Sequence, residues 1–594
     1  MRLRALPIAT LVMALACADE DAAPISENET TTVDPVARSL ALAEAYVDAY
    51  FEQFPEEAYE AGYPDAPAER LSDRSLSALA VWHAHEDSLL RDLEAIDSTA
   101  LVGTEAEIPH GYALDRVRTS VARRICRMEL WNVSPTWTGW PELFPSVFAQ
   151  QPVDTPEARA ALLARARDVD RFLDTEVANL REGMRLGYTA AKPDVDAVIA
   201  QVDGLLELPV EDSPFLEPVG RVDDGAFGDS LRGIVAEEVV PAARRYRDFL
   251  ATEYRSAARE EVGVTANPDG AACYEASVRY FTTLPLTAEE IHASGLREMD
   301  RIQAEMREVA ERLFGTADVK QALSRAREPR FTFRSEDEIL AYARAAVERG
   351  KAAVPEWFGF IPEGEVVVRP YPAFQKRTGG GFYSAGLPGQ PGTYLLGTYE
   401  PQNLSKAGLE ATAFHETYPG HHMQASVVLE KGGAHPVLKY LYNSGMGEGW
   451  ALYTERLADE MGLYSGDIDR LGMLSNEALR AARLVVDPGM HALGWSRERA
   501  VQYMLENTAE SEGEVGYEID RYLAVPGQAT AYLTGSLEIQ RLRFEAETRL
   551  GERFDIRAFH DRVLENGTIS LPMLQSEIER WVMEQEAEPG TVSR

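Results

Sequence analysis

The 594-residue chain is poor in lysine, histidine and cysteine, and basic residues are outnumbered by acidic ones. Only 7 of its 59 basic residues are lysines, so an active site built on a reactive lysine has few candidates. The 97 acidic residues leave a formal net charge of −38. Because binding to nucleic acid needs a basic face that neutralises phosphates, this balance argues against a nucleic-acid-binding protein.

Long apolar runs, low-complexity tracts and repeats of 20–50 residues are also missing from the sequence. Without 18 or more consecutive apolar residues, we expect no membrane-spanning helix. Apolar residues make up 45% and charged residues 26% of the chain, which excludes a disordered or collagen-like protein. The composition therefore predicts a globular protein with enough material for a large core.

The N-terminus has the pattern of a secretory signal. A basic start, Met1-Arg-Leu-Arg4, is followed by an apolar stretch that ends at Ala16 and is too short to span a bilayer. Ala14-Leu-Ala-Cys17 resembles a bacterial lipoprotein signal, in which Cys17 is lipidated, although leucine is usual where Ala14 stands. Plain cleavage by signal peptidase is the alternative. In either case we expect export from a bacterial cytoplasm, to the periplasm or as an outer-membrane-anchored lipoprotein, with a membrane contact only where Cys17 is lipidated.

After a signal peptide over residues 1–17, residues 18–36 are acidic and poor in large apolar side chains, which is typical of a flexible linker. No second linker of this kind follows, so we predict a single large helical metallohydrolase domain over residues 37–594. Within it only Cys126 and Cys273 remain. In an oxidising compartment they form either one disulfide or two isolated buried thiols.

Helical patterns dominate this region. Capping boxes at Thr287–Glu290 and Ser335–Glu338 predict helices that run to about residues 314 and 349. Apolar spacing predicts further helices over residues 37–62, 74–97, 156–186 and 228–261. Strand-like sequence is confined to a few places, notably residues 365–370 and 393–398. Between them lies a glycine-rich stretch, residues 377–383, which we interpret as a turn or a substrate-side flap. We therefore expect a mainly α fold with a small β element.

Three of the ten histidines fall within eight residues, in Phe414-His-Glu-Thr-Tyr-Pro-Gly-His-His422. A His-Glu pair followed by further histidines is typical of zinc hydrolases, in which imidazoles hold the metal and the glutamate is the general base. The second ligand usually stands four residues after the first, but Pro419 occupies that position here. The alternative is a helical turn with surface histidines.

Helix geometry decides whether these histidines can share an ion. On an unbroken helix His421 is rotated by about 240° from His415 and displaced by about 9 Å, and His422 is displaced by about 10.5 Å. At these positions neither histidine can share one zinc ion with His415, because Zn–N bonds are only about 2.0–2.1 Å long. Because Pro419 disfavours helix at the preceding residue and Gly420 tolerates unusual dihedral angles, we predict that the helix breaks here and restarts near His421, beside His415.

A third ligand is expected from Gly445-Met-Gly-Glu448-Gly-Trp-Ala-Leu-Tyr-Thr-Glu455, which begins shortly after the histidines. The two glutamates are seven residues apart and so lie on one helical face. We expect Glu448 to bind the metal and Glu455 to orient an imidazole. The alternative, a solvated acidic stripe, is disfavoured because Trp450 and its apolar neighbours indicate a buried helix.

The strings HETYPGHHMQ and GEGWALYTERLADEMG resemble the bacterial family catalogued as domain of unknown function 885. Further matching segments are Pro268-Asp-Gly270, Leu286–His292, Arg483–His491, Gly494–Arg497 and Pro526–Tyr532, so the motifs cover about residues 265–545. This family is regarded as related to helical zinc peptidases with a glutamate third ligand. The resemblance implies a large helical zinc-peptidase-like fold with a deep cleft.

The resemblance also implies roles for particular residues. Aligning Gly420-His421 with the Gly-His of the peptidases' shorter motif makes His415, His421 and Glu448 the Zn2+ ligands, with His422 as the alternative to His421. Related peptidases use histidine or tyrosine donors to stabilise the oxyanion, and His491 and Tyr532 are our choices. Remaining candidates are Tyr383 as a third oxyanion donor and five arginines that could hold a substrate carboxylate: Arg480, Arg483, Arg497, Arg541 and Arg543.

The predicted function is zinc-dependent hydrolysis of peptide bonds in short peptides, with Glu416 as general base. Hydrolysis of a non-peptide amide or ester at the same site is the first alternative. A non-catalytic cell-surface scaffold with a structural metal is the second, and the intact Glu416 argues against it. A serine hydrolase is disfavoured because the sequence has no Gly-x-Ser-x-Gly elbow.

Overall fold

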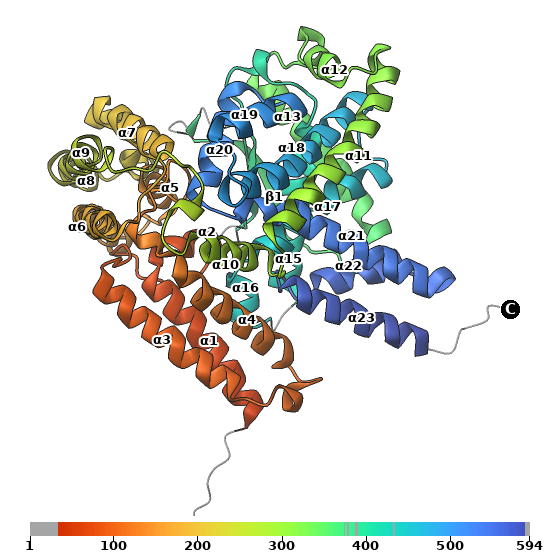
Figure 1. Cartoon of the computed structure of the whole chain (residues 1–594), viewed down its shortest axis with the longest axis horizontal. Helices are drawn as coiled ribbons and strands as arrows, with labels where there is room; N and C mark the ends of the chain where they lie inside the picture. The colour runs from red at the N-terminus through yellow and green to blue at the C-terminus, as the bar shows by residue number, and fades with distance from the viewer. Residues whose placement is uncertain (1–33, 373–374, 377–378, 386–389, 432–433, 588–594) are drawn as a thin grey trace, which may run out of the picture. The chain divides into compact units, whose positions relative to one another are not determined.

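The computed structural model describes residues 34–372, 375–376, 379–385, 390–431 and 434–587. Contacts join the described residues from Pro35 onwards into one unit (Figure 1), which is mainly helical and in its described part has one small sheet. The expected fold class, mainly α with a small β element, is confirmed at this level. The predicted signal peptide and all of the linker up to residue 33 lie outside the described residues. No helix among those described combines the length and the apolarity that crossing a membrane requires.

The N-terminal helices form two groups. The first group contains α1 (Pro35–Gln53), α2 (Ala58–Ala61), α3 (Leu76–Glu94) and α4 (Glu107–Arg123). The second contains α5 (Trp140–Gln150), α6 (Pro156–Leu186), α7 (Lys192–Glu207), α8 (Gly225–Ile234) and α9 (Val240–Phe249), with π-helical turns at Val235–Val239 and Leu250–Tyr254. The helix predicted over residues 37–62 ends early, at Gln53, because Pro55 disfavours helical geometry at Phe54.

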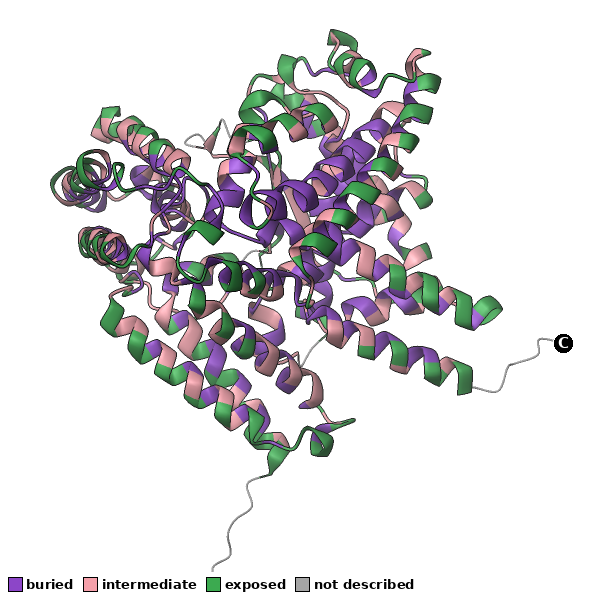
Figure 2. Ribbon diagram, in the orientation of Figure 1, coloured by how far each residue is buried: buried purple, intermediate pink, exposed green. Residues whose placement is uncertain are grey.

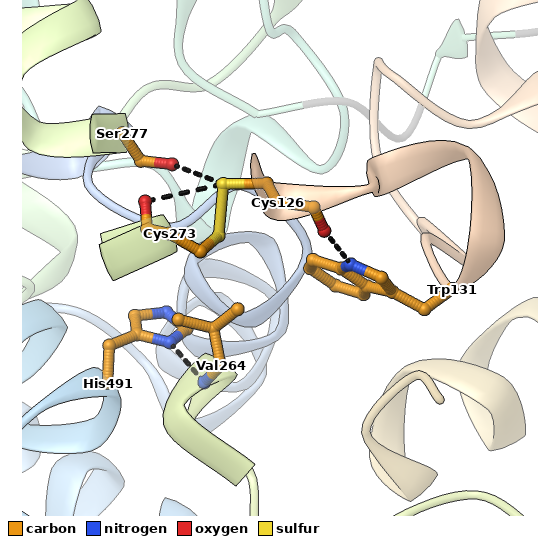
Figure 3. The surroundings of a disulfide bond; sticks show 6 residues. All are labelled: Cys126, Trp131, Val264, Cys273, Ser277 and His491. Atoms are coloured by element: carbon orange, nitrogen blue, oxygen red, sulfur yellow. Dashed lines mark hydrogen bonds between the residues drawn. A yellow bond between two sulfur atoms is a disulfide. The ribbon is translucent and has the colours of Figure 1, made fainter. Parts of the chain in front are cut away.

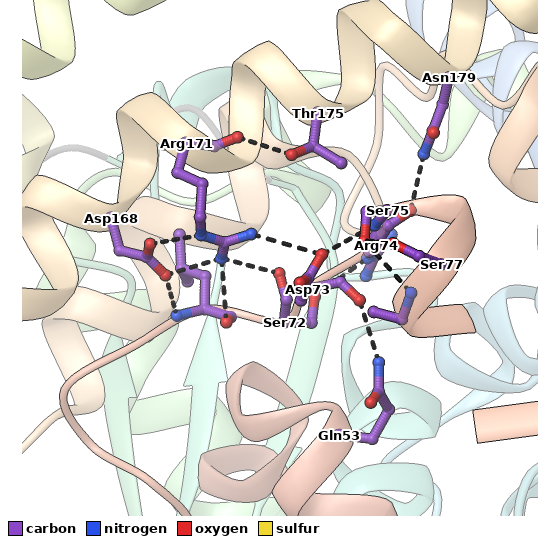
Figure 4. A network of polar contacts seen from close by, with 12 residues as sticks. Gln53, Ser72, Asp73, Arg74, Ser75, Ser77, Asp168, Arg171, Thr175 and Asn179 are labelled. Atoms are coloured by element: carbon purple, nitrogen blue, oxygen red, sulfur yellow. Dashed lines mark hydrogen bonds and ion pairs between the residues drawn. The ribbon is translucent and has the colours of Figure 1, made fainter. Parts of the chain in front are cut away.

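A polar network ties these two groups together (Figure 4). The Leu71 amide donates to Asp168 on α6 at 2.7 Å, and Arg171 of the same helix donates to the Ser72 carbonyl at 3.0 Å. From α1, the Gln53 amide donates to the Asp73 carbonyl at 3.1 Å. The segment before α3 is therefore fixed to helices on both of its sides.

The middle of the chain contains α10 (Gly270–Thr282), α11 (Ala288–Phe314), α12 (Val319–Arg325) and α13 (Glu336–Trp357). The capping box at Thr287 is present in full and α11 ends where predicted. Ser335 caps α13 through the Glu338 amide, but the Glu338 carboxylate accepts from the Arg334 amide instead of the Ser335 amide. This helix continues to Trp357, two turns beyond the predicted end.

The sheet contains β1 (Val366–Pro370), β2 (Gly381–Ser384) and β3 (Gly392–Leu396), in the order β1-β3-β2. β3 is central: it pairs parallel with β1 and antiparallel with β2. The two predicted strands are confirmed. The interpretation of residues 377–383 as a turn is wrong for residues 381–383, because these lie in β2, while residues 377–378 lie outside the described residues.

The C-terminal helices pack around α14 (Leu409–Glu416), which contacts α13, α15, α17, α18 and β2. The remaining helices are α15 (His421–Glu430), α16 (Pro436–Tyr440), α17 (Ser444–Glu460), α18 (Asp467–His491), α19 (Arg497–Asn507), α20 (Glu512–Ala524), α21 (Ala531–Leu550), α22 (Ile556–Leu564) and α23 (Leu571–Ala587). Figure 2 shows α18 buried along most of its length, and α11 lies beside it. Helices α17 and α21 also pack together.

Cys126 and Cys273 form a disulfide, which decides between the two alternatives left by the sequence (Figure 3). The bond joins Cys126, in the 3-10 turn Arg124–Cys126 that follows α4, to α10 across 147 residues of sequence. Both cysteines are buried. The disulfide therefore fixes α10 next to the first group of N-terminal helices.

Candidate functional site

The helix breaks between the histidines as predicted. His415 and Glu416 end α14, and His421 begins α15. Between the two helices the Gly420 amide donates to the Phe414 carbonyl at 3.0 Å. The rings of His415 and His421 come to lie 4.9 Å apart, centroid to centroid. The break therefore absorbs the two residues that separate this motif from the usual spacing.

Close packing explains the glycine at position 420. A Cβ atom there would lie 1.9 Å from the His415 carbonyl oxygen and 2.5 Å from the Phe414 carbonyl oxygen. The backbone φ of Gly420 is −80°, so the residue is required by this contact and not by a left-handed conformation. The loop is held from the other side by Trp450, whose indole N–H donates to the Pro419 carbonyl at 3.0 Å.

Glu448 on α17 completes a group that could hold a metal ion. One carboxylate oxygen of Glu448 lies 3.5 Å from Nε2 of His415 and 3.5 Å from Nε2 of His421. The ligand atoms of the three residues all lie within 4.8 Å of one another. Two ligands bound tetrahedrally at about 2.0–2.1 Å from zinc are separated by about 3.3 Å, so the observed distances fit such a centre.

Glu455 lies seven residues after Glu448, on the same face of α17, and contacts Nδ1 of His415. Its carboxylate lies 2.9 Å from Nδ1 of His415, and the side chain is fully buried. The Glu455 carboxylate can thus fix the ring and leave Nε2 free to face Glu448. Burial lowers the pKa of His415, but the carboxylates of Glu448 and Glu455 overcome this effect and raise the pKa to about 9. This contact is the one expected from the sequence.

Glu416 faces the same region from the last turn of α14. Burial raises its pKa, although His415 and His421 lower it and Glu448 raises it further. The sheet packs against it, because a Cβ at Gly381 of β2 would lie 3.3 Å from the Glu416 side chain. Glu416 is therefore a buried carboxylate beside the three potential ligands.

His422 is engaged away from this group. Its Nε2 donates to the Gly364 carbonyl at 3.0 Å, and its Nδ1 lies 3.0 Å from the hydroxyl of Tyr383. Burial lowers the pKa of His422 to about 4. The geometry therefore favours His421 over His422 as the second ligand. It also gives Tyr383 the task of holding His422, which leaves no donor for an oxyanion.

His491 lies in a different environment, next to Val264 and near the disulfide (Figure 3). It is fully buried; its Nδ1 accepts from the Val264 amide at 3.0 Å and its Nε2 donates to the Tyr522 carbonyl at 2.9 Å. Burial lowers its pKa to about 4. Because both ring nitrogens already have backbone partners, His491 has no free donor for an oxyanion. It instead links the end of α18 to the Val264 segment and to α20.

Tyr532, on the first turn of α21, is half-buried, and the Arg483 guanidinium lies 4.4 Å above its ring. It also interacts electrostatically with Tyr442, a residue that sequence reasoning missed. Tyr442 is 45% exposed, and its hydroxyl packs against Gly447, where a Cβ would lie 2.3 Å from it. The exposed part is not the hydroxyl: burial of that group and the Glu448 carboxylate raise the pKa of Tyr442. The only sequence signal was its place six residues before Glu448.

The five candidate arginines differ in whether a carboxylate already pairs with them. Four of them form close ion pairs: Arg483 with Glu518, Arg497 with Asp520, Arg541 with Glu538 and Arg543 with Glu460. Arg480 is the exception, since its nearest carboxylate is Glu455 at 3.8 Å and its Nε is buried without a hydrogen-bond partner among the described residues. Arg480 also interacts electrostatically with Glu416, so it faces the potential metal group.

Two surface hollows are found elsewhere. One of about 400 Å³ lies beside Trp495 and one of about 410 Å³ beside Arg456. Neither is lined by a residue of the potential metal group. At that group itself the side chains of His421 and Glu448 are 15% and 16% exposed, so water can reach both.

A protein-family model described as bacterial protein of unknown function (DUF885) matches residues 55–578. The chain belongs to the DUF885 family. Among solved structures, this family member is similar to a candidate lipoprotein from Colwellia psychrerythraea, with 26% identity and a TM-score of 0.85 over 93% of this chain and 100% of that one. It is also similar in fold to a candidate lipoprotein of unknown function from Shewanella oneidensis, with 18% identity and a TM-score of 0.70 over 90% and 99% of the two chains. Among proteins with curated descriptions, none matches.

Proposed function

We propose that the chain is a zinc-dependent hydrolase that cleaves peptide bonds in short peptides. The observation that carries the proposal is the group formed by His415, His421 and Glu448, whose ligand atoms lie within 4.8 Å of one another. Glu416 is adjacent to it in the sequence and in space. A structural zinc site has four protein ligands, whereas a catalytic one keeps a position open for water.

The residues present fit zinc. Two imidazole nitrogens and one carboxylate oxygen are ligands that zinc accepts, and the 3.5 Å separations match the edges of a tetrahedron. The Glu455 contact to Nδ1 sets the tautomer in which Nε2 of His415 is the ligand. When bound, zinc supplies a Lewis acid that polarises a carbonyl group and makes water a better nucleophile at neutral pH.

Glu416 is placed to act as the general base. Its carboxylate accepts a proton from the attacking water and donates that proton to the leaving nitrogen. The oxyanion that forms on the substrate carbonyl needs a hydrogen-bond donor. We assign this role to Tyr532 and Tyr442, which interact with each other; the Tyr442 hydroxyl donates to the Glu448 carboxylate here and would be a free donor once that carboxylate binds the metal. Tyr532 therefore remains a proposed oxyanion donor, as the sequence predicted, and Tyr442 replaces His491 as the other one.

The relation to helical zinc peptidases with a glutamate ligand belongs to the same proposal. It is supported by the order of the parts along the chain: a helix that ends in His-Glu, a second histidine after a break, and a glutamate on a later helix, α17. A deep cleft over this group would admit short, unfolded peptides and exclude folded proteins. The net charge of −38 is compatible with such substrates and offers no basic face for nucleic acid.

The test combines metal analysis with hydrolysis of a peptide mixture, read by mass spectrometry. We expect one zinc per chain, and cleavage products that disappear when the metal is removed and return with Zn2+. The variant Glu416→Gln should keep its zinc and lose at least a hundredfold in rate, since general base catalysis contributes about 10²–10⁴-fold. Glu289→Gln, on the exposed face of α11, is the matched control and should cleave normally.

Three results would count against the proposal. Unchanged hydrolysis by Glu416→Gln would refute the assigned base. Tight zinc without hydrolysis of any peptide would favour the scaffold with a structural metal. Cleavage of simple amides or esters but not of peptides would show that the same site acts on a non-peptide substrate.

We further propose that the protein is exported and lipid-anchored through Cys17. The support is the sequence pattern around Cys17, together with the two similar structures, both of candidate lipoproteins. Expression of the full chain in a Gram-negative bacterium should place it in the outer-membrane fraction with labelled fatty acid attached, and Cys17→Ser should lose both the label and the outer-membrane location. Equal fractionation of both proteins would contradict the anchor.

A further inference from the structure

Two arginines on one face of α4 have no carboxylate partner. Among the residues that the structure describes, neither Arg116 nor Arg123 lies within 4.0 Å of an acidic side chain. Their neighbours on the same segment do: Arg118 pairs with Glu94 at 2.9 Å, and Arg124 pairs with Glu86 at 2.7 Å. Arg116 and Arg123 are seven residues apart, and a separation of two helical turns places both side chains on the same face.

Both guanidinium groups converge on α10. The guanidinium carbon of each arginine lies 4.6 Å from the centroid of the Tyr280 ring. The two guanidinium groups are therefore near each other. Arg123 also lies 4.6 Å above the ring of Phe281. Its Nε is buried and has no hydrogen-bond partner among the described residues. A buried cation without an anion is costly, so this face has an unmet requirement for negative charge.

The acidic side chains that interact electrostatically with Arg116 have other partners, and one of them, Asp115, pairs with Arg279 at 3.5 Å. Glu57 interacts electrostatically with Arg116, but its carboxylate is bonded to the Tyr50 hydroxyl at 2.5 Å. For Arg123, burial lowers the pKa, Tyr280 raises it and the charge of Arg116 lowers it further. For Arg116, burial lowers the pKa and the surrounding tyrosines, Tyr280 foremost, raise it. Aromatic rings therefore surround the two guanidinium groups, and no carboxylate among the described residues is in ion-pair contact with either.

This face lies close to the proposed metal group. A Cβ at Gly445 would lie 2.9 Å from the Thr282 carbonyl oxygen and 3.0 Å from the Phe281 carbonyl oxygen, so the end of α10 packs against the first turn of α17. Glu448 follows Gly445 by three residues, a rise of about 4.5 Å. Phe281 thus lies between Arg123 and the helix that carries Glu448. Glu60 connects the two regions, because burial and the carboxylates of Glu57 and Glu448 raise its pKa to about 7, so it lies near both of them.

We propose that Arg116 and Arg123 bind a carboxylate of the substrate and so position the peptide for cleavage at the His415–His421–Glu448 group. This inference rests on the proposed function and adds the chemical class of the substrate. Arginine is suited to the task, because its planar guanidinium donates two parallel hydrogen bonds to a carboxylate. The carboxylate comes from the C-terminus of the peptide or from an aspartate or glutamate side chain.

The experiment uses three acetylated peptides of one length, incubated with the zinc-loaded protein. The first ends in a free carboxylate, the second is its C-terminal amide, and the third is an amide with one alanine replaced by glutamate. We expect kcat/KM for the first or third peptide to exceed that for the second by at least tenfold. Whichever of the two is preferred identifies the source of the carboxylate. Equal kcat/KM for all three peptides would overturn the proposal.

The arginine variants then test the residues. Arg123→Met and Arg116→Met should each remove most of the preference by lowering kcat/KM for the carboxylate peptide at least tenfold, while cleavage of the neutral amide changes less than threefold. Arg118→Met removes the same charge from the opposite side of α4 and should keep the preference. If both site variants slow all three peptides equally, the arginines are structural and the proposal is wrong. If one variant fails to fold, as judged by Tm, the other decides.

A separate measurement distinguishes this inference from the proposed function. The same peptides are titrated into the protein and binding is followed by calorimetry, which does not depend on cleavage. If no peptide is hydrolysed but the carboxylate peptide binds at least tenfold more tightly than the amide, and Arg123→Met abolishes the difference, the hydrolase proposal fails and the carboxylate site stands. If cleavage occurs and binding shows no such difference, the carboxylate site is refuted and the hydrolase stands.

Discussion

Replacing Gly420 by alanine should destroy the proposed metal centre while leaving the rest of the fold in place. The new Cβ would lie 1.9 Å from the His415 carbonyl oxygen, whereas Cβ atoms essentially never approach another heavy atom within 3.0 Å. The backbone must therefore move by at least about 1 Å between the two histidines. Metal–ligand distances tolerate deviations of about 0.2 Å, so the displacement exceeds the tolerance several-fold.

We expect Gly420→Ala to weaken zinc binding at least a hundredfold, measured by competition with a chromogenic chelator. The contact is to backbone, so no side-chain rotation can relieve it. In the metal-free state the far-ultraviolet circular dichroism should remain close to that of the parent. Gly204→Ala is the matched control: Gly204 lies in α7 with nothing within 4 Å of a new Cβ, and alanine there should stabilise the fold by about 0.5–1 kcal/mol. Unchanged zinc affinity in Gly420→Ala would refute the reasoning.

Three further predictions concern residues around this centre and the disulfide. Glu455→Gln removes the charge that orients His415 and should lower zinc affinity about 10–100-fold without changing the stoichiometry, as measured by chelator competition. Replacing both Cys126 and Cys273 by serine removes a cross-link that spans 147 residues of sequence. The free energy of unfolding, measured by denaturant titration, should fall by up to about 5 kcal/mol, because the unfolded chain regains the entropy that the cross-link removes. Burial raises the pKa of Asp487 to about 7, and its carboxyl group contacts the Tyr274 hydroxyl at 2.7 Å. The folded state then binds a proton that the unfolded state has lost, so the stability contributed by Asp487 should fall as pH rises from about 4 to 7; Asp487→Asn should flatten this part of the Tm–pH curve, and identical curves would contradict it.

The break between His415 and His421 was predictable because its causes are local. Pro419 and Gly420 act on the backbone of their immediate neighbours, and the number of residues between the histidines is fixed by the chain. The helix start at Thr287 was predictable for the same reason, since a capping box is complete within four residues. The apolar pattern does not predict the end of α1, because it continues beyond Pro55, whereas the proline ends the helix.

The surroundings of His491 and Tyr442 could not be predicted from the sequence. His491 follows a matching motif, yet the Val264 amide and the Tyr522 carbonyl, which come from distant parts of the chain, use both of its nitrogens. Tyr442 belongs to no motif, and only the packing of its ring against Gly447 places it beside Glu448. Such contacts depend on how helices pack and not on neighbours in sequence.

By itself the sequence determined the mainly helical class, the family, and the residues from which a metal centre can be built, because composition, periodicity and short-range steric rules are properties of consecutive residues. Tertiary structure decided which residues meet. It brought Glu448 and Glu455 of α17 to opposite nitrogens of His415, chose His421 over His422, and placed Arg116 and Arg123 around Tyr280 on α10. The physical reason is that these distances are fixed by the packing of helices from distant parts of the chain, which no local pattern encodes.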